Sequence, residues 1–284
     1  MTHSHGIPNR AWSYWAQGLD QLDPIVELCL SSWKSRGGFD TIVVVDSESV
    51  YDYLPKDTLP PTFSSLPFQL QSDFVRLALL REYGGIWMDA STLVTAPIAD
   101  WLNSMKIDEG CFFFQNPGKG EGGRLFETGF LAARPNHPFF SDWLEALGAL
   151  FQRERVHRAH SPSSDAPHFF KLLFGFLNKH LRRSASLSAL WALPPLSWLP
   201  FYPFFVVHYV GSMLLLRTTH SNVLLGMDQV NAKHYLAIRA ISNKSGWVEA
   251  LNSPSLRNSP VHDVEFRRPF TPSELRAFKK FAEI

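Results

Sequence analysis

The segment S-D-F-V-R-L-A-L-L-R-E-Y-G-G-I-W-M-D-A-S-T-L, residues 72–93, reads as the end of a helix followed by a short strand. Apolar side chains recur near helical spacing at Phe74, Leu77, Ala78 and Leu80. Gly84 and Gly85 follow at once and should end the helix, because glycine adopts a left-handed backbone at the least cost. Residues 86–88 then fit a short buried strand, and Asp89 lies where that strand opens into a loop.

Three charged residues of this segment are candidates for a functional site. Asp73 and Arg76 are three residues apart, so they share one face of the predicted helix. Asp89 ends a strand, which is where open α/β sheets bind their ligands. Two anions and a cation would then converge on one crevice. The spacing alone fits equally well a surface ion pair between Asp73 and Arg76 and a simple turn at Asp89.

The residues before this segment favour an α/β fold. Strands and helices are predicted to alternate as strand 10–14, helix 24–36, strand 41–45, helix 67–83 and strand 86–88. The fourth of these should begin near Pro67, with Ser64 or Ser65 as its cap. Such alternation is typical of a mainly parallel central sheet flanked by helices. No G-x-G-x-x-G or G-x-x-x-x-G-K follows the early strands, so dinucleotide and P-loop sites lack their glycine loops.

The remaining sequence predicts strands at 111–115 and 128–133 and helices from Pro138, over 227–241 and over 272–284. We expect one domain over residues 1–284, with residues 1–9 as a loose tail. The chain is 45% hydrophobic, enough for a sizeable core, and its net charge of +1 excludes an electrostatic case for nucleic acid. Cys29 and Cys111 have neither disulfide-framework nor zinc spacing. The polar N-terminus lacks an apolar signal segment, so a cytoplasmic location is expected.

Residues 184–216 contain no Asp, Glu, Lys or Arg. This apolar segment approaches the length of a membrane span, but four prolines interrupt its first half. A buried core segment or a homodimer face, docking on a membrane surface and a true span all remain open.

The sequence of residues 72–91 resembles the signature of the sugar-binding-region glycosyltransferases (glycosyltransferase family 32), in the pattern S-D-x-x-R-x-x-x-L-x-x-Y-G-G-I-W-x-D-A-S. It is most similar to their capsular polysaccharide synthesis branch. The opening I-P-N-R-A-W-S-Y-W-A-Q-G and the closing S-P-V-H-D also resemble that family. The resemblance implies a GT-A-like nucleotide-sugar-binding fold. It also implies a hexosyltransferase that acts with retention of configuration in polysaccharide biosynthesis.

Residue by residue, the resemblance implies that Asp73 and Arg76 hold the donor sugar. Asp89 would belong to a D-x-D-type motif that meets a metal and the donor diphosphate. Ser91 stands where the second aspartate of that motif would be, and the capsular branch shows the same Asp-Ala-Ser/Thr pattern. A divalent ion, Mn²⁺ or Mg²⁺, is therefore implied as cofactor, since carboxylate and phosphate oxygens suit both.

The other blocks of resemblance imply further site residues. Trp12 or Trp15 would stack on the nucleotide base, with core packing as the alternative for each. Thr128 would border the donor pocket, and His262 would lie near the metal or a phosphate. Asp263 departs from the family, because a lysine is expected there.

The donor would be a nucleotide sugar, and the acceptor a glycan, a lipid-linked molecule or a small molecule. The enzyme could also touch a membrane surface through residues 184–216. Two alternatives of other classes remain. One is a catalytically weak protein that binds sugar nucleotide or glycan. The other is a glycoside hydrolase that uses Asp73 and Asp89; against it, Arg76 is expected to lower the pKa of Asp73 and spoil it as an acid.

Overall fold

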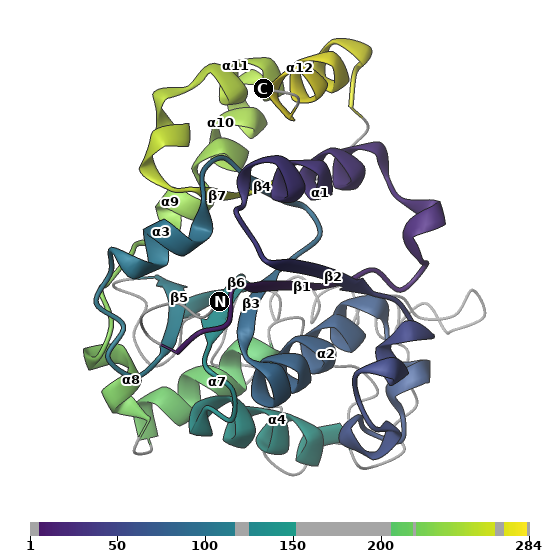
Figure 1. Ribbon diagram of the computed structural model, residues 1–284, viewed down its shortest axis with the longest axis vertical. Helices are drawn as coiled ribbons and strands as arrows, with labels where there is room; N and C mark the ends of the chain where they lie inside the picture. Colours follow the sequence, from purple (N-terminus) through teal and green to yellow (C-terminus); the bar gives the residue numbers. More distant parts are fainter. Residues whose placement is uncertain (1–5, 117–124, 152–205, 218–219, 265–269, 283–284) are drawn as a thin grey trace, which may run out of the picture.

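A five-stranded sheet with the order β2-β1-β3-β6-β5 forms the centre of the computed structural model (Figure 1). The structure describes residues 6–116, 125–151, 206–217, 220–264 and 270–282. The strands of this sheet are β1 (Arg10–Tyr14), β2 (Thr41–Val45), β3 (Gly85–Met88), β5 (Cys111–Gln115) and β6 (Phe126–Ala133). The expected α/β architecture is confirmed.

The directions of the strands make the sheet mixed but mainly parallel. β1 pairs in parallel with both β2 and β3, whereas β6 pairs antiparallel with β3 and with β5. Within the described sheet, β6 is therefore the strand that runs against the other four. As a result, the beginning of β6 lies at the same edge as the C-terminal end of β3, where Asp89 follows.

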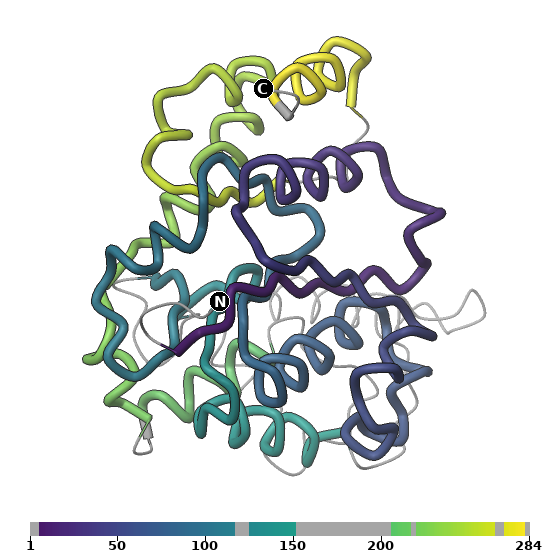
Figure 2. Tube along the Cα trace, viewed as in Figure 1, coloured from purple at the N-terminus to yellow at the C-terminus, as the bar shows by residue number. Residues whose placement is uncertain are grey.

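Helices cover both faces of the sheet (Figure 1). One side carries α2 (Phe68–Tyr83), α4 (Pro138–Phe151) and α7 (Val206–Arg217). The other side carries α1 (Pro24–Arg36) and the C-terminal helices α10 (Ala237–Ser245), α11 (Trp247–Asn252) and α12 (Pro272–Ala282). Figure 2 shows how the C-terminal part of the chain returns to α1, against which α12 packs.

Shorter elements connect these layers. The pair β4 (Thr92–Val94) and β7 (Val261–Asp263) forms a second, two-stranded sheet. The short helices are α3 (Ile98–Asn103), α8 (Ser221–Leu225) and α9 (Ala232–Tyr235). Single 3-10 turns occupy Leu19–Gln21, Ser49–Asp52, Lys56–Thr58, Phe63–Ser65 and Pro254–Asn258. The helix predicted over 227–241 is thus two short helices, α9 and the first half of α10.

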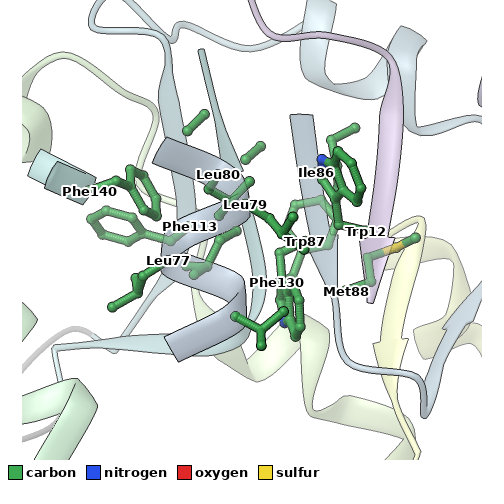
Figure 3. Packing of buried hydrophobic residues seen from close by; sticks show 14 of the residues in the cluster. Trp12, Leu77, Leu79, Leu80, Ile86, Trp87, Met88, Phe113, Phe130 and Phe140 are labelled. Carbon is green, nitrogen blue, oxygen red and sulfur yellow. The ribbon is translucent and has the colours of Figure 1, made fainter. Parts of the chain in front are cut away.

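The main hydrophobic core lies between the sheet and α2 (Figure 3). Leu77, Leu79 and Leu80 of α2 are fully buried, as are Trp87 of β3 and Phe130 of β6. A second cluster fills the space between α1 and the C-terminal helices, with Ile25, Cys29, Trp247 and Phe278 at zero exposure. The last helix is therefore docked on the body of the protein.

The glycine pair ends α2 as predicted, but the start of this helix differs from prediction. Gly84 and Gly85 have φ values of 61° and 98°, and a Cβ on Gly84 would lie 2.6 Å from the backbone nitrogen of Pro135. At the other end, Pro67 occupies the N-cap with an extended backbone and no side chain caps the helix. The predicted serine cap is wrong because Ser65 and its neighbour are part of the preceding 3-10 turn.

Two further predictions are altered by burial. Ile7 is fully buried and the Asn9 side chain donates to the carbonyl of Gly38 at 2.9 Å, so the chain is anchored before residue 10. Residues 184–205 of the uncharged segment lie outside the described residues. Its last part belongs to α7, whose Val206 and Leu215 are buried in the core. Among the described helices, none is long and apolar enough to cross a membrane.

Candidate functional site

Arg76 is the centre of a buried charge cluster at the C-terminal edge of the sheet. Its Nη1 lies 3.3 Å from Asp73 Oδ1, and its Nη2 lies 3.0 Å from Asp89 Oδ1. The side chains of Arg76 and Asp73 are only 5% and 10% exposed, whereas that of Asp89 is 38% exposed. The structure thus brings the three predicted residues together. A surface ion pair is excluded, because the Asp73–Arg76 pair is buried.

The fold holds the guanidinium of Arg76 from several directions. Nη1 also donates to the backbone carbonyl of Thr128 at 3.0 Å, and Nη2 lies 3.4 Å from Ser72 Oγ. The guanidinium carbon lies 5.2 Å from the centre of the Trp87 ring, within the range of a cation–π contact. Arg76 is therefore held by three elements: α2, β3 with the turn after it, and β6.

The carboxylate of Asp89 has two unequal oxygens. Oδ1 accepts from Arg76 Nη2 and from Trp87 Nε1, each at 3.0 Å. Oδ2 receives no hydrogen bond from the described residues and is not among their buried polar atoms without a partner, so it reaches solvent. The backbone is held as well, since Asp89 N donates to Gly129 O at 2.9 Å and Thr92 N donates to Asp89 O at 2.8 Å. The result is a rigid carboxylate with one oxygen available to a ligand.

The contact from Trp87 was missed by the sequence reasoning, although the signal was present. Trp87 and Asp89 are two residues apart, so their side chains point to the same face of an extended chain. The W-x-D spacing therefore predicts an indole N–H beside the carboxylate. Gly129 was missed too, and its proximity depends on the antiparallel pairing of β6 with β3.

Burial raises the pKa of Asp73 to about 7, with a smaller contribution from the negative charge of Asp89, while Arg76 opposes the rise. Arg76 thus lowers this pKa as expected, but burial outweighs it, so the expectation that Asp73 is spoiled as an acid is wrong. Desolvation outweighs the neighbouring cation, because Asp73 has lost nearly all contact with water. The case against a hydrolase now depends on access: the buried side chain of Asp73 cannot readily meet a glycosidic bond.

The other predicted residues of the donor pocket lie in different environments. Trp12 is fully buried, packs against Tyr53 and Tyr83, and donates from Nε1 to the carbonyl of Gly84 at 2.9 Å. This is the core-packing alternative, and it leaves no free ring face for a base. Trp15 directly follows β1 and is half-buried, and its Nε1 donates to the carbonyl of Gln21 at 3.3 Å.

Thr128 and Ser91 both lie close to the cluster. Thr128 is buried at the beginning of β6, where its carbonyl accepts from Arg76 and its Oγ1 lies 3.2 Å from His208 Nε2. Ser91 lies in the turn after Asp89, and its carbonyl accepts from the backbone nitrogen of Val264 at 3.0 Å. The structure thus places both residues at this edge of the sheet.

His262 is not brought to Asp89. It lies opposite Leu93 in the β4–β7 pair, while Asp263 lies opposite Thr92. Since opposed residues share a face and successive residues alternate, His262 faces the second hydrophobic cluster with Leu93. Its Nε2 lies 3.2 Å from the carbonyl of Leu256, and burial lowers its pKa to about 4.

Asp263, which replaces an expected lysine, has a cationic partner of its own. Its Oδ2 lies 2.6 Å from Arg239 Nη1, on α10. Arg267 and Arg268, the next two cationic residues along the chain, lie outside the described residues.

The residues available to a metal are few. A metal site built from protein ligands alone needs about three His, Cys, Asp or Glu side chains close together. The described ranges contain no such group. The outward oxygen of Asp89 is the ligand atom that the described cluster offers. This donor set fits an ion such as Mg²⁺ or Mn²⁺ that takes most of its ligands from substrate phosphates and water.

Comparisons with known proteins identify the family of the chain. The family model described as "Capsular polysaccharide synthesis protein" matches residues 2–158, more than half of the 284-residue chain. The chain is 29% identical over 160 residues to the O-glycosyltransferase braB of Annulohypoxylon truncatum, covering 49% of this chain and 37% of that protein. It is 31% identical over 101 residues to the O-glycosyltransferase PaGT of Phomopsis amygdali, covering 31% and 25%.

The matched part thus spans well under half of the length of either relative. Among solved structures, one described as "PaToxG Glycosyltransferase" aligns with 98% of this chain and 86% of its own, at a TM-score of 0.40 and 12% identity.

Proposed function

The chain belongs to the capsular polysaccharide synthesis protein family, and from this premise we propose that it is a glycosyltransferase. It would move a sugar from a nucleotide-sugar donor to a glycan, lipid-linked or small-molecule acceptor. The observation that carries the proposal is the Asp73–Arg76–Asp89 cluster, buried except for one outward carboxylate oxygen. Two relatives named as O-glycosyltransferases support it.

The cluster suits a site that orients a donor. Arg76 is locked between two carboxylates, so its guanidinium is preorganised and loses little freedom when a sugar hydroxyl or phosphate binds. Asp73 fixes Arg76 from the buried side. Asp89 presents Oδ2 outward, where it can accept from a sugar hydroxyl or meet a cation held by the diphosphate.

A bound divalent ion would neutralise the charge that develops on the leaving nucleoside diphosphate. We propose Asp89 Oδ2 as its protein ligand, with Ser91 as a candidate neighbour. The chain's own part is to keep Oδ2 in place through the indole of Trp87 and the turn that closes at Thr92.

We propose that transfer retains configuration by attack on the face that the diphosphate leaves. The bond between the anomeric carbon and the diphosphate oxygen breaks, the acceptor oxygen bonds to that carbon, and its proton passes to a departing phosphate oxygen. Asp73 is buried, and we assign Asp89 Oδ2 to the donor and its cation, so neither carboxylate is proposed as a covalent nucleophile. The protein therefore acts mainly by positioning the reactants.

The test is donor hydrolysis by the purified protein. UDP-, GDP- and CMP-sugars are offered with Mn²⁺, with EDTA, and to Asp89→Asn. We expect metal-dependent release of nucleotide from one donor, reduced at least about a hundredfold in the variant, because the missing charge acts on the transition state. Asp108→Asn is the matched control, since Asp108 is an exposed partner of Lys106 at the opposite edge of the sheet.

The rival proposal is a protein that binds a sugar nucleotide without turning it over. It predicts that one donor raises the melting temperature while no nucleotide is released, even with acceptors present. If no donor on the panel is cleaved and none changes the melting temperature, the proposed function is wrong.

A further inference from the structure

Tyr235 reaches the site from a part of the chain outside the family match, which ends at residue 158. It is the last residue of α9 and is only 2% exposed. Its ring stacks on Phe114 of β5, with the ring centres 5.2 Å apart and the planes at 15°. Its hydroxyl lies 3.1 Å from Thr92 Oγ1, and Thr92 closes the turn that begins at Asp89.

The approach of α9 is set by backbone contacts with the end of β5. Gln115 N donates to the carbonyl of Val230 at 2.8 Å, and Gln115 forms an isolated parallel bridge with Asn231. Asn231 then caps α9, because its side chain accepts from the backbone nitrogen of Lys233 at 2.9 Å. These contacts fix where the helix starts, and Tyr235 follows one turn later.

Gly129 connects Tyr235 to Asp89. A Cβ built on this glycine would lie 2.6 Å from the Tyr235 hydroxyl and 3.1 Å from Asp89 Oδ2. The hydroxyl and the outward carboxylate oxygen therefore both border the same bare stretch of backbone. The same glycine accepts the backbone hydrogen bond of Asp89 through its carbonyl. A side chain here would push apart the two groups that border the site.

The hydroxyl stays protonated in this environment. Burial, and then the negative charges of Asp263, Asp89 and Glu127, raise the pKa of Tyr235 well above its ordinary value. Tyr235 is thus a neutral group among carboxylates, able to form a hydrogen bond without adding charge to the site.

We infer that Tyr235 is a positioning residue for Asp89, so that the segment carrying α9 completes the donor site. The stacked ring places the hydroxyl on Thr92, and this contact holds the turn from which the Asp89 carboxylate points outward. The inference rests on the proposed function for its effect on catalysis, but its effect on the turn can be measured without a substrate.

The experiment compares Tyr235→Phe, Gly129→Ala and the double variant, with Tyr83→Phe as the matched control. Tyr83 also loses one hydrogen bond, to the carbonyl of Tyr53, away from Asp89. We expect Tyr235→Phe to lower kcat for the donor about fivefold, the worth of one hydrogen bond. KM should change less than about twofold, because the loss is felt mainly in the transition state. Tyr83→Phe should leave both constants unchanged.

The double variant tests the geometry itself. Gly129→Ala should be the more damaging single change, because its methyl group must displace the hydroxyl. Without that hydroxyl, the next atom of residue 235 lies 3.4 Å away, an ordinary contact. The double variant should therefore be more active than Gly129→Ala alone. The inference is overturned if the activity losses of the two single variants simply multiply in the double variant. It is also overturned if Tyr235→Phe has the kcat of the wild type.

Hydrogen–deuterium exchange gives a readout that is independent of turnover. In Tyr235→Phe, peptides covering residues 88–94 should exchange faster than in the wild type and in Tyr83→Phe, at unchanged melting temperature. If residues 88–94 exchange faster in Tyr235→Phe but the wild type cleaves no donor, the proposed function is wrong and the positioning role stands. If the wild type cleaves a donor but exchange in Tyr235→Phe is unchanged, the proposed function stands and the positioning role is wrong.

Discussion

The raised pKa of Asp73 predicts an unusual dependence of stability on pH. The pKa of this carboxyl rises from 3.8 to about 7, because burial outweighs the attraction of Arg76. Between these values the unfolded chain has lost the proton and the folded chain has kept it. Stability from this group is therefore complete below pH 3.8 and is lost as the pH rises towards 7.

The magnitude follows from the size of the shift. Each pH unit in this window costs about 1.4 kcal/mol, so the whole interval amounts to roughly 4 kcal/mol. Asp73→Asn removes the titrating group while it keeps the shape of the side chain. Relative to the wild type, the variant should thus gain about 2–3 kcal/mol of unfolding free energy between pH 5 and pH 7.

Urea unfolding of both proteins at pH 5, 6, 7 and 8 measures this difference directly. Asp108→Asn is the control, because Asp108 is exposed and its removal should leave the pH dependence of stability as in the wild type. A stability difference between Asp73→Asn and the wild type that stays constant with pH would refute the argument. A difference that grows in favour of the wild type as the pH rises would show that Arg76 prevails over burial.

Two other substitutions test single features of the fold and the site. Arg76→Lys keeps the charge but cannot contact both carboxylates and the Thr128 carbonyl at once, so donor kcat/KM should fall about tenfold or more in steady-state assays. The control Arg134→Lys, at a half-buried arginine beside the carbonyl of Glu109, should leave donor kcat/KM unchanged. Gly84→Ala should lower the unfolding free energy by more than about 1 kcal/mol, because φ is 61° and the backbone of residue 135 blocks a Cβ. Gly148→Ala, inside α4 with open space around it, should instead raise the unfolding free energy by about 0.5–1 kcal/mol.

Local patterns in the sequence determined most of the elements. The bounds of β1, β2, β5 and α1 agree with prediction, because short apolar runs and helical spacing report directly on which residues face a core. The glycine pair after α2 is equally local, since only glycine accepts two consecutive positive φ values at low cost. The same patterns placed Asp73 and Arg76 on one helix face and Asp89 at a strand end.

Only the tertiary structure decided how these residues behave. The pKa of Asp73 depends on how much water the rest of the chain removes from it, which no spacing reports. Whether an aromatic residue of β1 packs in the core or lines a pocket likewise depends on its neighbours. Trp12 packs in the core. Thr128 reaches the cluster because β6 pairs antiparallel with β3. Tyr235 reaches it because α9 docks on the end of β5. Local sequence sets the conformation of each segment, but the charge and environment of the site arise from contacts between segments that lie far apart in the chain.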